Sequence, residues 1–223
     1  MYPFFRPLLF RLDPETAHTL TLYALRFAGA IPPINTIIAK AFSALARPVT
    51  AFGLTFMNPV GLAAGYDKDG VAIRGLSALG FGHIEIGTVT PRPQPGNPKP
   101  RVFRLVEEQA VINRMGFPGL GAEVAAGNVS TFERSNVIIG VNLGKNKDTP
   151  LENAAEDYIT LMRRFMGLAD YLAINVSSPN TVGLRRLQGR EMLEGLLGEI
   201  AKERESIALP EGHRDGVGRG GHK

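Results

Sequence analysis

The sequence has no cysteine and no tryptophan among its 223 residues. Without cysteine the chain cannot form disulfides, thiolate metal sites or a cysteine nucleophile, and it fits a reducing compartment. Histidine is also scarce, and the four histidines do not stand at metal-ligand spacings, so we expect no zinc or di-iron site. These histidines are His18, His83, His213 and His222.

Long apolar runs are missing too, since no stretch approaches the roughly 18–20 apolar residues of a membrane span. The first seven residues lack the charged region, apolar core and cleavage site of a secretion signal. Residues 1–47 do combine Phe, Leu and Ile with basic charge, because five Lys or Arg stand against two acidic residues, a net +3. Two interpretations stay open: an element that lies on a membrane surface, or a helical cap with a solvated basic face. Nucleic-acid binding is disfavoured, because basic and aromatic residues do not interleave.

Residues 1–47 are predicted to form a helical hairpin. The run Asp13-Pro14-Glu15 supplies an N-cap, a proline for the first helical position and an acid at the positive end of a helix. The Pro32-Pro33 pair should end this helix, and a second helix should span about residues 35–45. We therefore expect residues 1–47 to be a helical domain and residues 48–209 to be the next domain.

From residue 48 onward, apolar strand-like runs alternate with helical segments. Such alternation indicates a parallel sheet with helices packed on it. The expected strands are residues 60–64, 83–89, 137–142 and 171–176, and the expected helices are residues 70–79, 119–131, 152–166 and 189–207. The proline-rich segment 91–100 lies between two strands, so we interpret it as a rigid ordered loop rather than a disordered linker or a polyproline ligand.

Several of the apolar runs end in polar residues. Polar groups at the carboxyl ends of successive parallel strands are how a (β/α)₈ barrel builds its active site. Such a barrel needs eight βα units, and four can be found up to residue 209. The predicted fold class is therefore α/β, of the (β/α)₈ TIM-barrel family, with about the first four βα units behind an N-terminal helical domain.

Residues 210–223 differ in character, with five glycines and a single aliphatic residue. Such a segment cannot be a buried strand, and we expect it to be disordered. A Gly/Arg-rich tail is one kind of RNA-binding segment, although this one has a single Arg-Gly-Gly. We favour a truncated or frame-shifted reading of a longer gene, because the 161 residues from Val49 to Leu209 fall short of the roughly 250 of a barrel.

The strand ends and nearby loops offer amides and hydroxyls rather than paired carboxylates. Neutral amides donate and accept hydrogen bonds in one plane, which suits a planar heterocycle such as a flavin or a pyrimidine. The alternative is that asparagines here cap turns. The lack of an acid–base carboxylate pair argues against sugar hydrolysis. The residues concerned are Lys68, Thr88, Asn113, Asn142, Asn175, Ser177, Ser178 and Asn180.

Three features carry possible chemistry, each with a structural alternative. Ser178 has no nucleophile elbow around it, so it suits a weak proton acceptor rather than a hydrolase triad, and a Ser-Ser-Pro turn is otherwise structural. Lys68 could balance a substrate carboxylate or a reduced flavin anion, or it could be a solvated loop lysine. Residues 113–117 combine an amide, apolar side chains and a permissive glycine, as a substrate-covering segment does.

These segments together resemble the class 2, quinone-dependent dihydroorotate dehydrogenases. The resemblance runs from residue 1 to about residue 209. The helical extension with Leu12-Asp13-Pro14-Glu15 and His18 resembles class 2 rather than the soluble class 1 enzymes. The matching motifs are Asn58–Gly70, Ile84–Asn97, Asn113–Phe117, Gly144–Lys147 and Asn175–Thr181.

The resemblance implies a role for each site residue. FMN would be held by Ala64, Gly65, Tyr66, Asp67, Lys68, Thr88, Asn142 and Asn175. Dihydroorotate would be held by Lys68, Asn113, Arg114, Met115, Gly116, Phe117, Asn175 and Asn180. Ser178 would be the catalytic base that takes the C5 proton, where class 1 enzymes place a cysteine. Electrons would leave to a membrane quinone near His18 and Arg104.

The implied activity is oxidation of dihydroorotate to orotate with FMN and a membrane quinone, in pyrimidine biosynthesis. The complete enzyme would be a monomer attached peripherally to the cytoplasmic side of the cell membrane. Family members continue into strands with a second lysine, a Thr-Asn pair and the Gly-rich loops that hold the FMN phosphate. We therefore expect a dihydroorotate dehydrogenase that is catalytically complete only as a longer product, and we expect this chain alone to be an inactive fragment of it. The alternative is a non-catalytic fragment that binds a membrane or a partner, and bound FMN would discriminate between the two.

Overall fold

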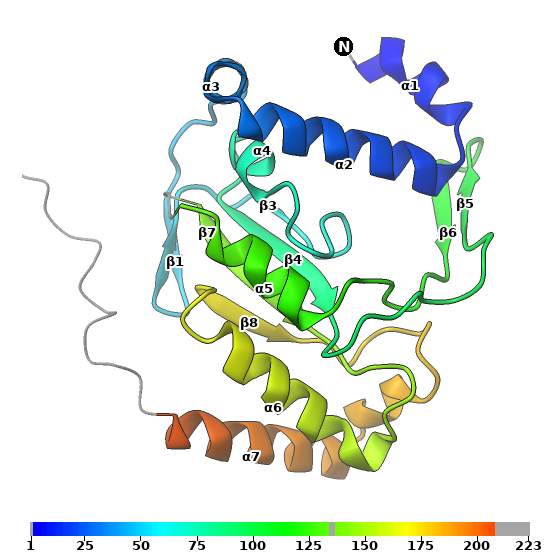
Figure 1. The fold of residues 1–223 in the computed structure, drawn as a ribbon, viewed down its shortest axis with the longest axis vertical. Coiled ribbons are helices and arrows are strands. Elements are labelled where there is room, and N and C mark those ends of the chain that lie inside the picture. The colour runs from blue at the N-terminus through cyan, green and yellow to red at the C-terminus, as the bar shows by residue number, and fades with distance from the viewer. Residues whose placement is uncertain (1, 134–136, 208–223) are drawn as a thin grey trace, which may run out of the picture.

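The computed structural model describes residues 2–133 and 137–207 as a parallel sheet covered by helices, with three further helices at the N-terminal end (Figure 1). The predicted tail, residues 210–223, lies outside the described residues. The N-terminal helices are α1 (Tyr2–Phe10), α2 (Pro14–Ala30) and α3 (Pro32–Ala41).

Four parallel strands form the central sheet, in the spatial order β3-β4-β7-β8. They are β3 (Gly61–Leu62), β4 (His83–Val89), β7 (Ile138–Leu143) and β8 (Tyr171–Ile174). The helices that follow them are α4 (Ile73–Ser77), α5 (Ala122–Ser130), α6 (Ala154–Phe165) and α7 (Arg190–Ser206), with the short 3-10 helices η1 (Leu151–Asn153) and η2 (Leu184–Gln188). All four predicted strands and their helices are confirmed, with small shifts of their ends.

The core lies between the sheet and its helices. Side chains alternate across a strand, so Ile84 and Ile86 of β4 share one face, and Val141 and Leu143 of β7 share it with them. These four residues are buried, and they belong to the same apolar cluster as Phe165 of α6. Burial of this face fixes the strand register, because a slip of one residue would expose it.

The opposite face of the sheet carries polar and aromatic side chains. His83 and Glu85 of β4 lie on this face, and Tyr171 of β8 reaches Glu85 across β7. Gly140 of β7 leaves room for the Tyr171 ring, since a Cβ atom at position 140 would lie 2.1 Å from that ring. This face is therefore built to hold large polar side chains beneath the strand ends.

Helix α2 packs closely against α4. Asp13 caps α2 as predicted, accepting hydrogen bonds from the backbone N–H groups of Glu15 and Thr16 at 3.0 and 3.1 Å. A Cβ atom at Gly75 of α4 would lie 2.1 Å from the Leu25 carbonyl oxygen, so the close approach of the two helices requires glycine there.

The second N-terminal helix is confirmed with shifted ends, whereas the expected hairpin was wrong. Helix α3 begins at Pro32 rather than near residue 35, because a proline in the first turn of a helix lacks only an N–H that has no partner there anyway. The chain bends by 110° between α2 and α3, so the two helices do not form a hairpin. In Figure 1, α3 is accordingly seen end-on beside the end of α2.

The sequence prediction missed two antiparallel hairpins. They are β1 (Val49–Ala51) with β2 (Leu54–Phe56), and β5 (Val102–Leu105) with β6 (Ala110–Asn113). These strands are three or four residues long and none of their residues is buried, so they fall short of the apolar run of four to eight residues by which a strand is recognised in a sequence. The proline-rich segment 91–100 is an ordered loop, as predicted, and the Asn146 side chain bonds both the N–H and the carbonyl of Arg92 at 3.0 Å.

Candidate functional site

Three polar side chains from neighbouring strands meet at the carboxyl end of the sheet. Thr88 of β4 donates to Asn142 Oδ1 of β7 at 2.5 Å. Asn175, directly after β8, donates from Nδ2 to Asn142 Oδ1 and to Thr88 Oγ1, both at 3.0 Å. We call Thr88, Asn142 and Asn175 the amide strip. The sequence prediction that these residues lie together is confirmed.

A carboxylate beneath the amide strip fixes the orientation of one amide. Glu85 Oε1 accepts from Asn142 Nδ2 at 2.8 Å, and Glu85 Oε2 accepts from the Tyr171 hydroxyl at 2.9 Å. Burial, and then the hydrogen bond to Glu85, raise the pKa of Tyr171, so the phenol stays protonated and donates. The sequence analysis missed this pair. A charged residue inside the apolar run of β4 was the signal for it.

The turn after β3 carries the predicted lysine. Gly65 and Asp67 exchange backbone hydrogen bonds with Gly87 of β4, at 2.8 and 3.2 Å, which ties the turn to the amide strip's strand. Lys68 Nζ donates to the Gly65 carbonyl at 2.6 Å. Burial lowers the pKa of Lys68, whereas the nearby Asp69 and Glu15 carboxylates act to raise it. The ammonium is thus held at the strand ends in a partly dehydrated environment.

Asp67 serves the turn itself. Its two carboxylate oxygens accept from the N–H groups of Val71 and Ala72, at 2.9 and 2.8 Å, so they anchor the chain at the approach to α4. Burial raises the pKa of Asp67, and these hydrogen bonds oppose that shift. Its side chain therefore shapes the loop rather than presenting a free charge.

The predicted substrate-covering segment meets the serine-containing turn. Asn180 Nδ2 donates to the Asn113 carbonyl at 3.2 Å, and the Asn180 N–H donates to Ser178 Oγ at 3.2 Å. Asn113 was expected at the end of a strand of the main sheet. It is instead the last residue of β6, in the separate hairpin β5–β6. Arg114 is exposed, and its guanidinium donates to the Pro100 carbonyl at 2.8 Å.

A cavity of about 700 Å³ lies between α2 and these loops. His18 of α2 lines it with Lys68 and Met115. The His18 Nε2 atom lies 2.6 Å from the Tyr66 carbonyl oxygen, which can only accept, so Nε2 carries a proton and Nδ1 remains an acceptor. Burial lowers the pKa of His18.

The two residues predicted at a quinone site are not equivalent. His18 lines the cavity, whereas Arg104 is not among its lining residues. The Arg104 guanidinium instead donates to the Leu12 carbonyl at 2.8 Å and lies over the Phe10 ring at 4.7 Å. Through these two contacts Arg104 fixes the segment between α1 and α2.

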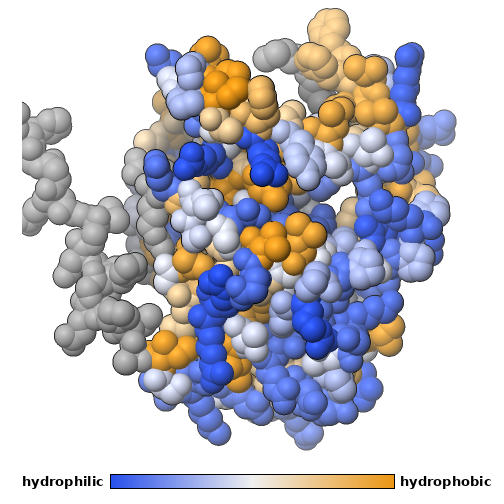
Figure 2. Space-filling view, viewed as in Figure 1, coloured by the Kyte–Doolittle hydropathy of each residue, from blue (hydrophilic) through white to orange (hydrophobic). Residues whose placement is uncertain are grey.

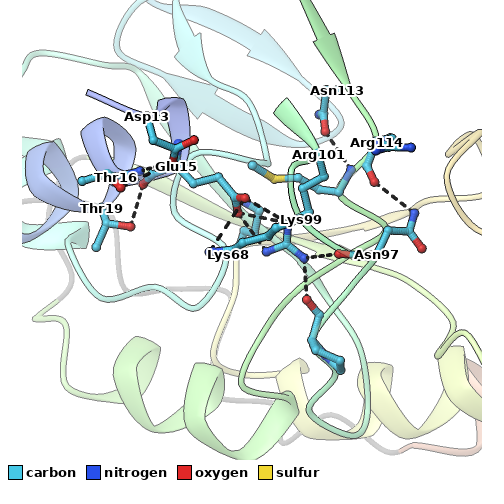
Figure 3. A network of polar contacts seen from close by, with 12 residues as sticks. Asp13, Glu15, Thr16, Thr19, Lys68, Asn97, Lys99, Arg101, Asn113 and Arg114 are labelled. Carbon is cyan, nitrogen blue, oxygen red and sulfur yellow. Dashed lines mark hydrogen bonds and ion pairs between the residues drawn. The ribbon is translucent and has the colours of Figure 1, made fainter. Parts of the chain in front are cut away.

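A buried ion pair forms another wall of the cavity. Arg101, 7% exposed, donates to the Glu15 carboxylate through Nε and Nη2, the shortest distance being 2.8 Å (Figure 3). The sequence analysis did not find this pair, because its members stand 86 residues apart and no periodicity links them.

A family model described as dihydroorotate dehydrogenase matches residues 47–210. The chain belongs to the dihydroorotate dehydrogenase family. Two curated relatives named dihydroorotate dehydrogenase (quinone), from Acidithiobacillus ferrooxidans and Xylella fastidiosa, are 57% and 54% identical over 93% and 95% of this chain. The chain spans 58% and 60% of the length of these two relatives.

A solved structure supports the fold within this family. The ligand-free DHODH of Eimeria tenella is 40% identical, with a TM-score of 0.73, over 89% of this chain and 55% of that one. The four βα units fit a partial fold of the (β/α)₈-barrel family with N-terminal helices before it, as the sequence predicted. The amide strip stands at the carboxyl ends of its strands, where such barrels place their active sites.

The N-terminal helices leave many apolar side chains exposed. Figure 2 shows them gathered over these helices at the top of the view. They include Phe4, Phe5, Leu8, Leu20, Tyr23, Phe27 and Ile37. In residues 2–133 and 137–207, no single helix meets the length and hydropathy expected of a membrane span, although the bent pair α2 and α3 meets them together.

Proposed function

We propose that this chain supplies the first part of an FMN- and dihydroorotate-binding site of a quinone-dependent dihydroorotate dehydrogenase. The amide strip, with Lys68 beside it, carries the proposal. It presents planar amides and a partly dehydrated ammonium at the ends of adjacent parallel strands. FMN, when bound, would supply the hydride acceptor for oxidation of a substrate carbon.

The residues at the strand ends fit that cofactor. Asn142 uses one amide N–H on Glu85 and its oxygen on Thr88 and Asn175, so a second N–H of its amide is available for a ligand. Residues 64–68, Thr88, Asn142 and Asn175 would hold FMN. Lys68 offers a positive charge for a reduced flavin or for a substrate carboxylate.

The loop of residues 113–117 and the turn that contains Ser178 and Asn180 fit a small planar substrate. We assign Asn113 to Phe117, Asn175, Asn180 and Lys68 to dihydroorotate. Ser178 would take the C5 proton while its own hydroxyl proton passes to solvent, as hydride leaves C6. Loss of the proton and the hydride turns the C5–C6 single bond into the double bond of orotate. The Asn180 N–H already donates to Ser178 Oγ, and such a bond favours the oxyanion that proton removal requires.

The N-terminal helices would bring the site to its electron acceptor. Residues 1–47 form the proposed membrane-docking domain, and residues 48–209 form the barrel part. Exposed apolar side chains on the helices and the cavity beside His18 suit a quinone entering from a membrane surface. We propose peripheral attachment to the cytoplasmic side of the cell membrane, and a monomer for the complete enzyme.

The amide strip is one wall of a site rather than an enclosed pocket. Leu172 and Ile174 of β8 are apolar yet only half-buried, unlike the buried residues of β4 and β7. We therefore propose that this chain alone holds FMN weakly and does not turn over. A purely membrane- or partner-binding role is the alternative, and it requires no flavin binding at all.

Flavin titration tests the proposal. Quenching of FMN fluorescence should show weak saturable binding to the wild-type chain, and Asn142→Ala or Asn175→Ala should weaken it about tenfold or more, since each removes a positioned hydrogen bond. Asn153→Ala is the matched control, because its exposed side chain makes no capping bond to α6. Equal affinity in all four proteins, or no saturable binding to the wild type, would count against the proposed site.

A further inference from the structure

Arg101 is a buried guanidinium whose hydrogen bonds point in two directions. On one side, Nε and Nη2 donate to the carboxylate of Glu15, in the first turn of α2. On the other side, Nη1 donates to the carbonyls of Pro95 and Asn97, at 2.6 and 2.9 Å. One side chain therefore joins an N-terminal helix to the proline-rich loop (Figure 3).

The contacts continue from that loop to the candidate substrate segments. Asn97 donates from Nδ2 to the Arg114 carbonyl at 3.0 Å and to the Asn180 carbonyl at 3.1 Å. The Asn97 N–H donates to the Met115 carbonyl at 2.8 Å, and the Arg114 N–H donates to the Arg101 carbonyl at 2.8 Å. Residues 94–97, 113–118 and 178–181 thus share one network with Arg101.

The Arg101–Glu15 ion pair is buried, so loss of either partner should break the connection between α2 and the proline-rich loop almost completely. Arg101 and Glu15 side chains are 8% and 16% exposed, so water replaces little of a lost contact. Removal of one partner leaves a buried charge uncompensated, which costs far more than loss of an exposed pair. Lysine cannot substitute for the planar fork that reaches Glu15 and two carbonyls together.

We propose that Arg101 is a positioning residue: its ion pair with Glu15 lets the docked N-terminal helices hold residues 113–118 and 178–181 in order. The role of these segments in binding dihydroorotate rests on the proposed function, whereas the mechanical link does not. If the first turn of α2 undocks, residues 113–118 and 178–181 become less ordered. By reciprocity, ordering these residues strengthens the docking of α2 by the same factor.

Hydrogen exchange followed by mass spectrometry tests this link in the chain as it stands, without ligand. Arg101→Lys and Glu15→Gln should each speed exchange in residues 94–97, 113–118 and 178–181 by about tenfold or more, while α6 stays as protected as in the wild type. Glu15→Gln is the sharper variant, since it alters no residue of those loops. Arg92→Lys is the matched control, because its ion pair with Asp148 is exposed.

Two results would overturn the proposal: unchanged exchange in residues 113–118 in both variants, or equally faster exchange throughout the chain including α6, which marks a general loss of stability. A separate arm adds orotate to the wild type. Protection of residues 113–118 by orotate supports the proposed function. If orotate gives no protection while the variants loosen the loops, the link stands and the substrate assignment fails.

Discussion

Glu85 accepts the side-chain N–H of Asn142 at 2.8 Å, and this contact determines which atom of that amide faces the other strands. With Nδ2 held by the carboxylate, Oδ1 receives the donors of Thr88 and Asn175. Tyr171 closes the arrangement from below by donating to the other oxygen of Glu85. The Glu85 carboxylate therefore sets the orientation of the Asn142 amide, and through it the hydrogen bonds within the amide strip.

Removal of that charge should lower stability. Glu85→Ala leaves the Asn142 amide and the Tyr171 hydroxyl without their shared acceptor, so the free energy of unfolding should fall by about 2–3 kcal/mol. Tyr171→Phe removes only one hydrogen bond and should cost about 1 kcal/mol. Urea unfolding followed by circular dichroism measures both. Glu199→Ala, on the exposed face of α7, should change stability by less than about 0.5 kcal/mol, and a similar loss there would refute the assignment.

Strand β4 could be predicted because its first four residues, His83 to Ile86, alternate between a half-buried polar face and a buried apolar face. The carboxyl ends of parallel strands meet at one edge, so the sequence alone was enough to group Thr88, Asn142 and Asn175. Contacts with no periodicity could not be found this way. Glu15 and Arg101 meet only because α2 docks beside the proline-rich loop, and nothing local in either segment records that docking.

The N-terminal helices show the same limit. The Asp13 cap is a local hydrogen-bond pattern and was predicted. The 110° bend between α2 and α3 depends on how each helix packs on the barrel part, so the expected hairpin was wrong. Asn113 was misplaced for a related reason: the hairpin β5–β6 is short and exposed, and its residues show no alternation that would reveal it.

Close packing of α2 on α4 makes Gly75 sensitive to one added methyl group. In Gly75→Ala the new Cβ would meet the Leu25 carbonyl oxygen at 2.1 Å, so the helices must separate, at a cost of about 1–3 kcal/mol. Gly198→Ala in α7 meets nothing within 4 Å and should stabilise the chain by about 0.5–1 kcal/mol, as alanine does in an exposed helix. Thermal unfolding compares the two, and shifts of the same sign would contradict the close approach.

The exposed apolar side chains of the N-terminal helices should drive membrane binding. Phe27 and Ile37 are 64% and 67% exposed, and burying such a side chain contributes about 1.5–3 kcal/mol. Phe27→Ser with Ile37→Ser should therefore reduce partitioning into anionic liposomes by tenfold or more, on the order of 1.4 kcal/mol at least. Val182→Ser changes an 84% exposed residue outside these helices and should leave partitioning unchanged. Co-sedimentation gives the three values, and equal loss in both variants would exclude the proposed surface.

His18 should make stability depend on pH in a defined direction. Burial lowers its pKa below the usual 6.5, so between the folded value and 6.5 the unfolded chain binds more protons than the folded chain. The free energy of unfolding must then fall as pH drops through that window, and the contribution of His18 is fully present above it. Protonation places a positive charge on a partly buried ring of α2 beside the cavity, and desolvation of that charge is what costs stability.

The His18→Gln variant isolates this contribution, because glutamine keeps an N–H donor for the Tyr66 carbonyl but does not titrate. Urea unfolding at a series of pH values from about 8 to about 5 should show a smaller loss of stability in the variant than in the wild type. Asp67 and Lys68 also have shifted pKa values, but they are present in both proteins and cancel in the difference. Direct titration of the His18 ring by NMR should give a pKa below 6.5. Identical pH profiles for the two proteins would show that burial does not lower the pKa of His18 in the folded chain.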